Sequence, residues 1–201
     1  MYRAVIFDFE GTLVNFAWDK ESAVREVRNL LSEHGIYAEG SYAELYNFVS
    51  VKHPRLKKDV DRIYDRYDLM AFRKWRVKDE VPEVLSKINA KKAIVSNVNG
   101  DLLRDALKDY RIADFFSIVI GRKDVDLLKP SDIGLKLAAE KLGVEKHEML
   151  FVGDSLTDVH ACRMAGIDIA VVEGEHRTEE MDADYKLSSL SDILSLPVHG
   201  L

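Results

Sequence analysis

Cysteine is nearly absent from this sequence of 201 residues, with Cys162 as its single copy. One cysteine cannot form an internal disulfide framework, and it cannot build a zinc site from cysteine ligands. We therefore expect Cys162 to be a small core residue of the helix that follows Asp158.

The sequence also lacks an excess of positive charge. Its 29 Lys and Arg residues face 35 Asp and Glu residues, which leaves a formal net charge of −6. Nonspecific binding of nucleic acid needs a basic surface, because the affinity comes largely from phosphate contacts. We therefore expect no nucleic-acid partner. The hydrophobic content of 47% is sufficient for the core of one large domain, or of one domain with a modest insertion.

Long apolar runs are missing as well. No run approaches the ~18 residues that a helix needs to cross a bilayer. The amino terminus reaches the acidic residues Asp8 and Glu10 too early for a secretory signal peptide. These features predict a soluble cytoplasmic protein without a membrane partner. They do not fix an oligomeric state, and a monomer is compatible with them.

Short apolar runs alternate with helical patterns over most of the chain. The expected strands lie at residues 5–7, 93–96, 118–120, 149–153 and 169–172. The expected helices include residues 131–142, which Gly143 ends, a helix that Gly166 ends, and a last short helix over residues 190–196. Repeated strand and helix units of this length predict an α/β fold with a doubly wound parallel sheet. We place this core domain in residues 1–14 and 79–201.

Residues 15–78 interrupt the alternation, because they contain helical patterns only. Asp19 can cap a first helix, and Gly35 can end it. Ser41 and Glu44 have the spacing of a capping box for a second helix. A third helix is indicated by apolar residues at helical spacing, namely Val60, Ile63, Tyr64 and Tyr67. The insert is therefore expected to be a small helical domain.

The first apolar run ends abruptly in Asp8, and Glu10, Gly11 and Thr12 follow it. A strand that is buried on both faces needs no alternation of apolar and polar residues, so this run predicts a central parallel strand. Ligands bind at the carboxyl ends of such strands, which makes Asp8 a candidate for chemistry. The structural alternative is an Asx turn, in which Asp8 only hydrogen-bonds to its own backbone.

Three further segments carry polar side chains close to the end of an apolar stretch. These side chains are Ser96 and Asn97 after residues 93–95, Lys129 after residues 127–128, and Asp154 and Asp158 after residues 149–153. Each has a structural explanation when it is taken alone. Ser96 can be a turn residue, Lys129 can be a solvated residue at a helix start, and Asp158 can favour an early helical turn through the helix dipole. Two acids spaced for one metal at a strand end are harder to explain in this way.

The order of an aspartate strand, a hydroxyl strand, a lysine and an acidic strand resembles the haloacid dehalogenase superfamily. This large group consists mainly of Mg²⁺-dependent phosphohydrolases that use an aspartate nucleophile. All four motif positions are filled here between about Arg3 and Val172. The resemblance implies a phosphatase that acts on a small phosphorylated metabolite and forms an aspartyl phosphate on Asp8. It also implies that residues 15–78 are a mobile cap, which closes over the substrate and sets specificity.

The resemblance implies a role for each candidate residue. Asp8, Asp154 and the backbone carbonyl of Glu10 would bind Mg²⁺, a hard cation that takes oxygen ligands, with Asp158 near it directly or through water. Lys129 would neutralise the phosphoryl oxygens. The remaining substrate contacts would come from Thr12, from the Ser96 hydroxyl and from the backbone amides after it, including that of Asn97.

One position departs from the family pattern, because the hydrolases of this family usually have Asp where this chain has Glu10. We expect Glu10 to protonate the leaving alkoxide and then to activate water, which requires a pKa raised above its usual ~4.3. The departure keeps open an alternative function as a catalytically weak sensor of phosphorylated ligands. A dehalogenase would need no acid at this position. A phosphonate hydrolase would need a buried cap lysine, and the sequence marks neither Lys52 nor Lys57 as one.

The insert offers fewer candidates for substrate binding. The basic segment at residues 52–58 is expected to be a solvated face. The tyrosines at helical spacing, Tyr42, Tyr46, Tyr64 and Tyr67, are expected to pack rather than to form a substrate cage. Trp18 lies just past the first motif, where the insert and the pocket would meet, so we expect it to contact the substrate.

Overall fold

A parallel sheet forms the centre of the computed structural model, which describes residues 1–174 and 181–198. Its six strands lie in the order β3-β2-β1-β4-β5-β6, and every neighbouring pair is parallel. The strands are β1 (Ala4–Phe7), β2 (Lys91–Val95), β3 (Ile118–Ile120), β4 (Met149–Gly153), β5 (Asp168–Val172) and β6 (Tyr185–Leu187). The predicted doubly wound α/β fold is confirmed, and β6 is a strand that the sequence did not indicate.

The direction of winding reverses beside β1. From β1 the chain continues outward to β2 and β3, and it then returns to β4 on the opposite side of β1. At the end of β1, Phe7 aligns with Ile94 of β2 and with Val152 of β4. The carboxyl ends of these three strands therefore lie together, at the point where doubly wound sheets bind their ligands.

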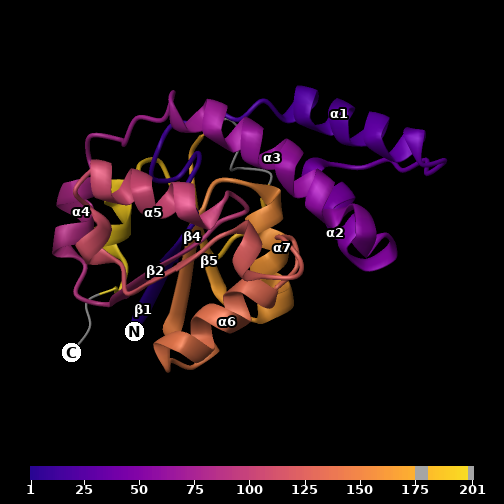
Figure 1. Ribbon diagram of the computed structural model, residues 1–201. Helices are drawn as coiled ribbons and strands as arrows, with labels where there is room; N and C mark the ends of the chain where they lie inside the picture. Colours follow the sequence, from indigo (N-terminus) through magenta and orange to yellow (C-terminus); the bar gives the residue numbers. More distant parts are fainter. Residues whose placement is uncertain (175–180, 199–201) are drawn as a thin grey trace.

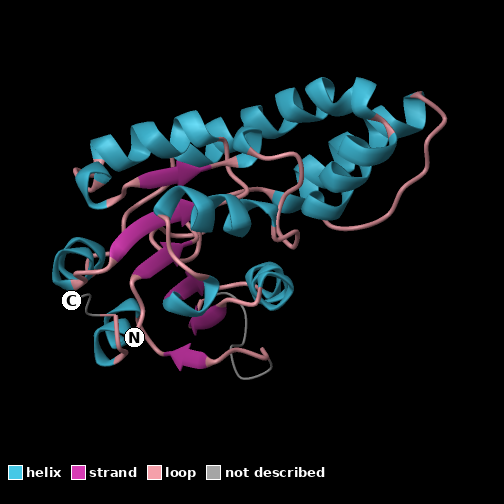
Figure 2. Ribbon diagram, turned by 90° about the horizontal axis from the view of Figure 1, so that it is seen from below, coloured by secondary structure: helices cyan, strands magenta, loops and turns pink. Residues whose placement is uncertain are grey.

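Helices cover both faces of the sheet (Figures 1 and 2). One face carries α4 (Val81–Lys87), α5 (Gly100–Asp109) and the 3₁₀ helix η6 (Leu190–Ser195), and the other carries α6 (Ile133–Leu142) and α7 (Leu156–Ala165). Successive strand side chains point to opposite faces, so Phe7 belongs to one apolar cluster and Ile6 to the other. Because both faces of β1 are buried, no polar side chain interrupts the strand before Asp8.

Three further helices lie at the end of the sheet where the strands finish (Figure 1). They are α1 (Lys20–Glu33), α2 (Tyr42–Lys52) and α3 (Lys57–Phe72). All three fall within the segment for which the sequence predicted helices only. The Asp19 side chain caps α1 by accepting a hydrogen bond from Ser22 N at 3.0 Å. Ser41 and Glu44 form the expected capping box at the start of α2.

The tyrosines of the helical insert pack around Trp18. The Trp18 ring lies 4.9 Å from the ring of Tyr42, 5.4 Å from that of Tyr64 and 6.1 Å from that of Tyr67. Tyr46 stacks on Tyr64 at 6.0 Å. Aromatic pairs at these separations stabilise a core by more than their buried area alone. The expectation that these side chains pack is therefore confirmed.

Two linkers join the insert to the sheet, and they pair with each other. Val14 and Val77 form an antiparallel bridge, and Lys78 N donates a hydrogen bond to Leu13 O at 3.0 Å. The chain therefore leaves the sheet and returns to it at one place.

Some boundaries differ from the sequence prediction. The helix expected from Ser131 begins at Ile133, because Ser131 lies in a turn in which its N–H donates to Leu128 O at 2.9 Å. The expected last helix is the 3₁₀ helix η6 rather than an α-helix.

Cys162 is buried in α7, as expected. Other short 3₁₀ segments are η1 (Pro54–Leu56), η2 (Ala113–Phe115), η3 (Arg122–Asp124) and η4 (Lys146–Glu148). Within the described residues, no helix combines the length and the apolarity needed to cross a membrane.

Candidate active site

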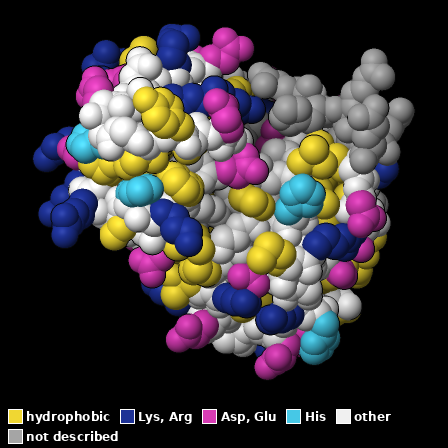
Figure 3. Space-filling view, turned by 90° about the vertical axis from the view of Figure 1, so that its right-hand side faces the viewer, with side chains coloured by type: hydrophobic (Ala, Val, Ile, Leu, Met, Phe, Trp, Pro, Cys, Tyr) yellow, Lys and Arg dark blue, Asp and Glu magenta, His cyan; other side chains and the backbone are white. Residues whose placement is uncertain are grey.

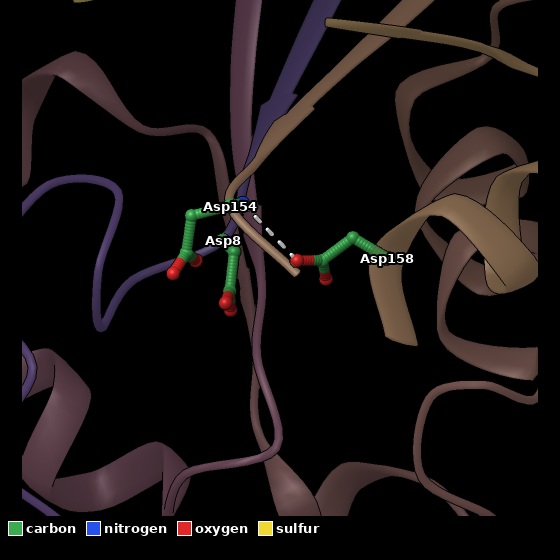
Figure 4. A group of neighbouring side chains, drawn as sticks. All are labelled: Asp8, Asp154 and Asp158. Atoms are coloured by element: carbon green, nitrogen blue, oxygen red, sulfur yellow. Dashed lines mark hydrogen bonds between the residues drawn. The ribbon is translucent and has the colours of Figure 1, made fainter. Parts of the chain in front are cut away.

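Three aspartates meet at the carboxyl end of the sheet (Figure 4). Asp8 follows β1, Asp154 follows the neighbouring strand β4, and Asp158 lies in the first turn of α7. One carboxylate oxygen from each of them lies within 4.8 Å of the other two. In Figure 4, Asp158 extends from its helix toward the ends of both strands. The fold therefore brings together the acids that the sequence singled out.

The turn after β1 approaches Asp154 closely. Gly11 has a left-handed backbone with φ +84°, and a Cβ atom there would lie 2.1 Å from Asp154 Oδ2, so only glycine fits. The next residue, Thr12, is buried, and its hydroxyl donates to Asp154 Oδ1 at 3.3 Å. Thr12 does not line the cavity described below. In the structure the Thr12 hydroxyl orients Asp154, and the expected substrate contact of Thr12 stays a prediction.

Lys129 lies between two of the aspartates. Its ammonium group is 2.9 Å from Asp8 Oδ1 and 2.6 Å from Asp158 Oδ1, and only 4% of its side chain is exposed. Burial lowers the pKa of Lys129, but the carboxylates of Asp158 and Asp8 outweigh this effect and raise the pKa overall. The second oxygen of Asp158 accepts hydrogen bonds from Ser155 Oγ at 2.7 Å and from Asp154 N at 3.3 Å. Asp158 thus holds Lys129 beside Asp8.

The site carries more negative than positive charge. Burial is the main reason why the pKa of Asp154 rises to about 8, and the charges of Asp158 and Asp8 add to the rise. Burial also raises the pKa of Asp8, although Lys129 opposes it. A divalent cation would relieve this repulsion, and carboxylate oxygens are the ligands that hard cations take. The residues present therefore fit a divalent metal ion, with Asp8 and Asp154 able to ligate it and Asp158 close by.

Ser96 and Asn97 follow β2 at the same edge of the sheet, and both line the cavity. The Asn97 carboxamide is already engaged. It accepts from Lys129 N at 3.0 Å, and it donates to Lys129 O at 3.0 Å and to Tyr42 Oη at 3.1 Å. The Asn97 side chain therefore fixes the backbone of Lys129, a role that the sequence did not indicate.

Glu10 lies on the cavity wall and is held there by two donors from the insert. Its Oε1 accepts hydrogen bonds from Trp75 Nε1 at 2.7 Å and from Ala17 N at 3.0 Å. Burial raises the pKa of Glu10 to about 7, even though both hydrogen bonds lower it. A carboxyl group with this pKa exists in both protonation states near neutral pH, as an acid–base catalyst requires. The Glu10 side chain is not part of the cluster of three aspartates.

A cavity of about 270 Å³ connects these groups. The sheet side contributes Asp8, Glu10, Ser96, Asn97, Val98, Lys129 and residues 154–158, and the insert contributes Phe16, Trp18, Lys20, Tyr42 and Asp68. Trp18 lines the cavity as expected, and Tyr42 lines it in addition to packing. The sequence did not mark Phe16, Lys20 or Asp68, which carry no motif and reach the cavity only through the fold.

The basic segment at residues 52–58 does not line this cavity. Lys52, Arg55 and Lys58 are exposed, which agrees with the expected solvated face. Acidic and basic side chains are interspersed on the face of the molecule that Figure 3 shows.

A buried ion cluster joins the insert to the sheet beside the cavity. Arg122 follows β3, and 1% of its side chain is exposed. Its guanidinium group lies 2.7 Å from Asp68, 2.5 Å from Asp65 and 3.5 Å from Asp61. These aspartates are four and three residues apart on α3 and so share one face of the helix. Asp68 also accepts a hydrogen bond from Asn99 N at 2.9 Å. We name Arg122 and the three aspartates the Arg122 cluster.

The fold and the site define a class of protein, namely a doubly wound α/β enzyme with an acidic, metal-competent centre at the switch point of its sheet. The sequence pattern of the haloacid dehalogenase-like hydrolases matches residues 5–172, and the chain therefore belongs to this family.

Relatives and a solved structure agree with this membership. Pyrophosphatase PpaX from Bacillus pumilus is 28% identical over 213 residues, which cover 96% of this chain and 95% of that protein. A phosphoglycolate phosphatase from Neisseria gonorrhoeae is 29% identical over 181 residues, which cover 82% of this chain and 77% of that protein. The crystal structure of a HAD-superfamily hydrolase of subfamily IA from Geobacter sulfurreducens has a TM-score of 0.67 at 18% identity, and the match covers 98% of this chain and 100% of that one. This last similarity concerns the fold alone.

Proposed function

We propose that this protein is a Mg²⁺-dependent phosphatase, which hydrolyses a small phosphorylated metabolite through an aspartyl phosphate on Asp8. The observation that carries the proposal is the presence of Asp8, Lys129 and Glu10 on the wall of one cavity. Displacement at phosphorus needs a nucleophile, positive charge for the phosphoryl oxygens and a proton for the leaving group, and these three side chains can supply them. The names of the two relatives, a pyrophosphatase and a phosphoglycolate phosphatase, support the same class of reaction.

The reaction takes two steps. In the first, an Asp8 oxygen attacks phosphorus, the bond from phosphorus to the leaving oxygen breaks, and protonated Glu10 gives its proton to that oxygen. In the second, a water molecule attacks phosphorus and Glu10 takes the proton of that water. The bond from phosphorus to Asp8 then breaks, which releases inorganic phosphate and the free carboxylate. Lys129 and the Ser96 hydroxyl stabilise the phosphoryl oxygens in both steps.

The metal ligands in this proposal are Asp8, Asp154 and the backbone carbonyl of Glu10, with Asp158 near the ion. When bound, Mg²⁺ supplies the positive charge that lets an anionic carboxylate and an anionic phosphoryl group approach each other. Thr12 keeps the Asp154 carboxylate oriented through its hydrogen bond.

Residues 15–78 are, in the same proposal, a cap domain on a core domain formed by residues 1–14 and 79–201. The support is that the insert contributes part of the cavity wall and joins the sheet at one place. Its two ends also hold the acid, because Ala17 and Trp75 both donate to Glu10. Cap closure would therefore assemble the cavity and position Glu10 in one movement, so that bulk water is excluded from the aspartyl phosphate while Glu10 is in place.

Release of inorganic phosphate from p-nitrophenyl phosphate tests this function. We expect multiple turnover with Mg²⁺, loss of activity in excess EDTA, and no turnover by a folded Asp8→Asn variant. Asp154→Ala should raise the Mg²⁺ concentration needed for half-maximal activity, whereas Asp105→Asn, which changes an aspartate 61% exposed on α5, should keep wild-type activity. Full activity in EDTA would contradict the metal requirement. A folded protein that binds phosphorylated ligands without turnover would instead support the sensor function.

A further inference from the structure

Lys20 is a cavity residue whose positive charge has no acidic partner among residues 1–174 and 181–198. Its side chain is half-buried, and its ammonium group lies 4.1 Å from the centre of the Phe16 ring, which lines the same cavity. Lys129, the other lysine of the lining, is paired with two carboxylates. Lys20 is therefore the lysine that can meet a ligand without first breaking an ion pair.

The position of Lys20 in its helix does not account for the charge. Lys20 is the first residue of α1, and the free N–H groups at that end of a helix favour acids and disfavour a lysine. Asp19 already caps the helix, and Glu21 supplies an acid in the first turn. A neutral residue at position 20 would suit α1 better, so helix stability gives no reason for a lysine there.

The acids of the cavity lining are engaged with other partners. Glu10 accepts from Trp75 Nε1 at 2.7 Å, and Asp68 is paired with Arg122 at 2.7 Å. The wall contributed by the insert is otherwise aromatic, with Phe16, Trp18 and Tyr42. Aromatic walls exclude water, and the exclusion strengthens any charge interaction that Lys20 makes.

The size of the cavity limits what lies between Lys20 and the aspartates. Its volume of about 270 Å³ is slightly below the range of about 300–1,000 Å³ that ligand pockets span. The insert forms part of the wall of this space, and Lys20 belongs to that part. A substrate whose phosphoryl group is bound by Lys129 and Asp8 has to fit its leaving group into the rest of the same small cavity, which Lys20 lines.

We infer that Lys20 selects substrates whose leaving group carries its own negative charge, either a carboxylate or a second phosphoryl group. The inference rests on the proposed function, since it assigns the phosphoryl group to Asp8 and the second anion to Lys20. A carboxylate keeps the same charge before and during cleavage of the bond from phosphorus to oxygen. Lys20 therefore binds such a substrate and its transition state about equally, so that the loss of Lys20 raises KM and leaves kcat nearly unchanged. A second phosphoryl group gains negative charge as it leaves, so for pyrophosphate the loss of Lys20 also lowers kcat.

Matched substrates test the inference kinetically. Phosphoglycolate and ethyl phosphate have leaving groups with the same two-carbon skeleton, and only the first carries a carboxylate; pyrophosphate carries a second phosphoryl group instead. We expect Lys20→Met to raise KM at least about tenfold for phosphoglycolate or pyrophosphate, as loss of a charge-assisted contact does, and to leave KM for ethyl phosphate unchanged. Lys20→Arg should restore most of the affinity. Lys52→Met, which removes an exposed lysine of α2 outside the cavity, should match the wild type.

Direct binding tests Lys20 independently of turnover. Calorimetric titration with Mg²⁺ present compares the affinities of three phosphonates. Besides its phosphonate group, 3-phosphonopropionate carries a carboxylate, methylenediphosphonate carries a second phosphoryl group, and propylphosphonate carries no second anion. The wild type should bind one of the first two at least about tenfold more tightly than propylphosphonate, and Lys20→Met should abolish that difference. The preferred ligand identifies the second anion. If the protein hydrolyses no phosphate ester but keeps this Lys20-dependent difference, the proposed function fails and the role of Lys20 stands. Equal weakening of all three ligands, or no weakening of any, would overturn the inference.

Discussion

Replacing Arg122 by methionine should lower the free energy of unfolding by about 3–5 kcal/mol at pH 8. Asp68, with 1% of its side chain exposed, would lose the guanidinium group 2.7 Å away and remain as a buried charge. Breaking a buried ion pair on one side costs about this much. The loss of the contact with Asp65 adds little to this cost in stability, because 30% of the Asp65 side chain is exposed and Lys123 remains 2.5 Å from it.

The loss of stability should depend on pH. Burial already raises the pKa of Asp68, and Arg122 opposes the rise. Without Arg122 the pKa of Asp68 in the folded state moves higher still, while its unfolded value stays near ~4. A carboxyl group with a raised folded pKa costs stability at high pH, and the cost disappears as the pH falls toward the unfolded pKa. The difference between Arg122→Met and the wild type should therefore be smaller at pH 5 than at pH 8.

Urea unfolding followed by circular dichroism at both pH values measures this difference. The double variant Arg122→Met, Asp68→Leu should be more stable than Arg122→Met alone, because it leaves no buried charge unpaired. Arg104→Met is the matched control, since Arg104 pairs with Asp101 and Asp124 at the surface and should cost at most about 1 kcal/mol. A loss below about 1 kcal/mol for Arg122→Met, or an equal loss at pH 5 and pH 8, would refute the reasoning.

Three further perturbations address other parts of the molecule. Glu10→Gln keeps a hydrogen-bond acceptor but has no proton to give, so turnover of an alkyl phosphate should fall by about 100-fold or more, and a wild-type rate would remove Glu10 from the mechanism. Gly11→Ala should abolish phosphatase activity, because the new Cβ would lie 2.1 Å from Asp154 Oδ2. Gly35 also has a positive φ, but a Cβ there would have no neighbour within 4 Å. Gly35→Ala should therefore lower the free energy of unfolding in urea by about 1 kcal/mol and keep its turnover. Similar activity in these two glycine variants would contradict the steric argument. Glu80→Gln should lower Tm at pH 7. Burial raises the pKa of Glu80, but hydrogen bonds from the start of η6 outweigh this effect and leave the pKa lowered. The stabilisation of the fold by the Glu80 carboxylate is therefore present above an unfolded pKa of ~4.3 and is lost as the pH falls. The Tm difference from the wild type should therefore disappear in acid, and a constant difference would argue against a role for the Glu80 charge.

The parts of the fold that the sequence predicted are those that a local pattern specifies. β1 and β4 are apolar on both faces and end in acids, so consecutive residues reveal both their central position and their chemistry. The caps at Asp19 and Ser41 likewise depend on residues three positions away. By contrast, β6 has three residues and buries only Leu187, which is too short a segment for a periodic signal.

The site could be predicted where parallel strands bring residues to one edge, and not where distant segments meet. Arg122 and Asp68 are 54 residues apart, and each alone resembles an ordinary surface charge. Thr12 belongs to the first motif, yet its hydroxyl turns to Asp154 rather than to the cavity. Lys20 stands at a helix start, and only the packing of the insert over the sheet makes it part of the cavity.

The bridge between Val14 and Val77 has a consequence for how such a chain can evolve. The segment between these two residues can change in length without moving the strands of the sheet, because the bridge already joins its two ends. The entropic cost of closing a longer segment grows slowly with its length, and ends tied in this way tolerate exchange of what they enclose. A helical layer of another size can therefore be grafted at the same two positions while the three aspartates stay where β1, β4 and α7 put them. The position of Glu10, by contrast, depends on Ala17 and Trp75 at the two ends of the insert, so these ends have to be kept when the helices between them are exchanged.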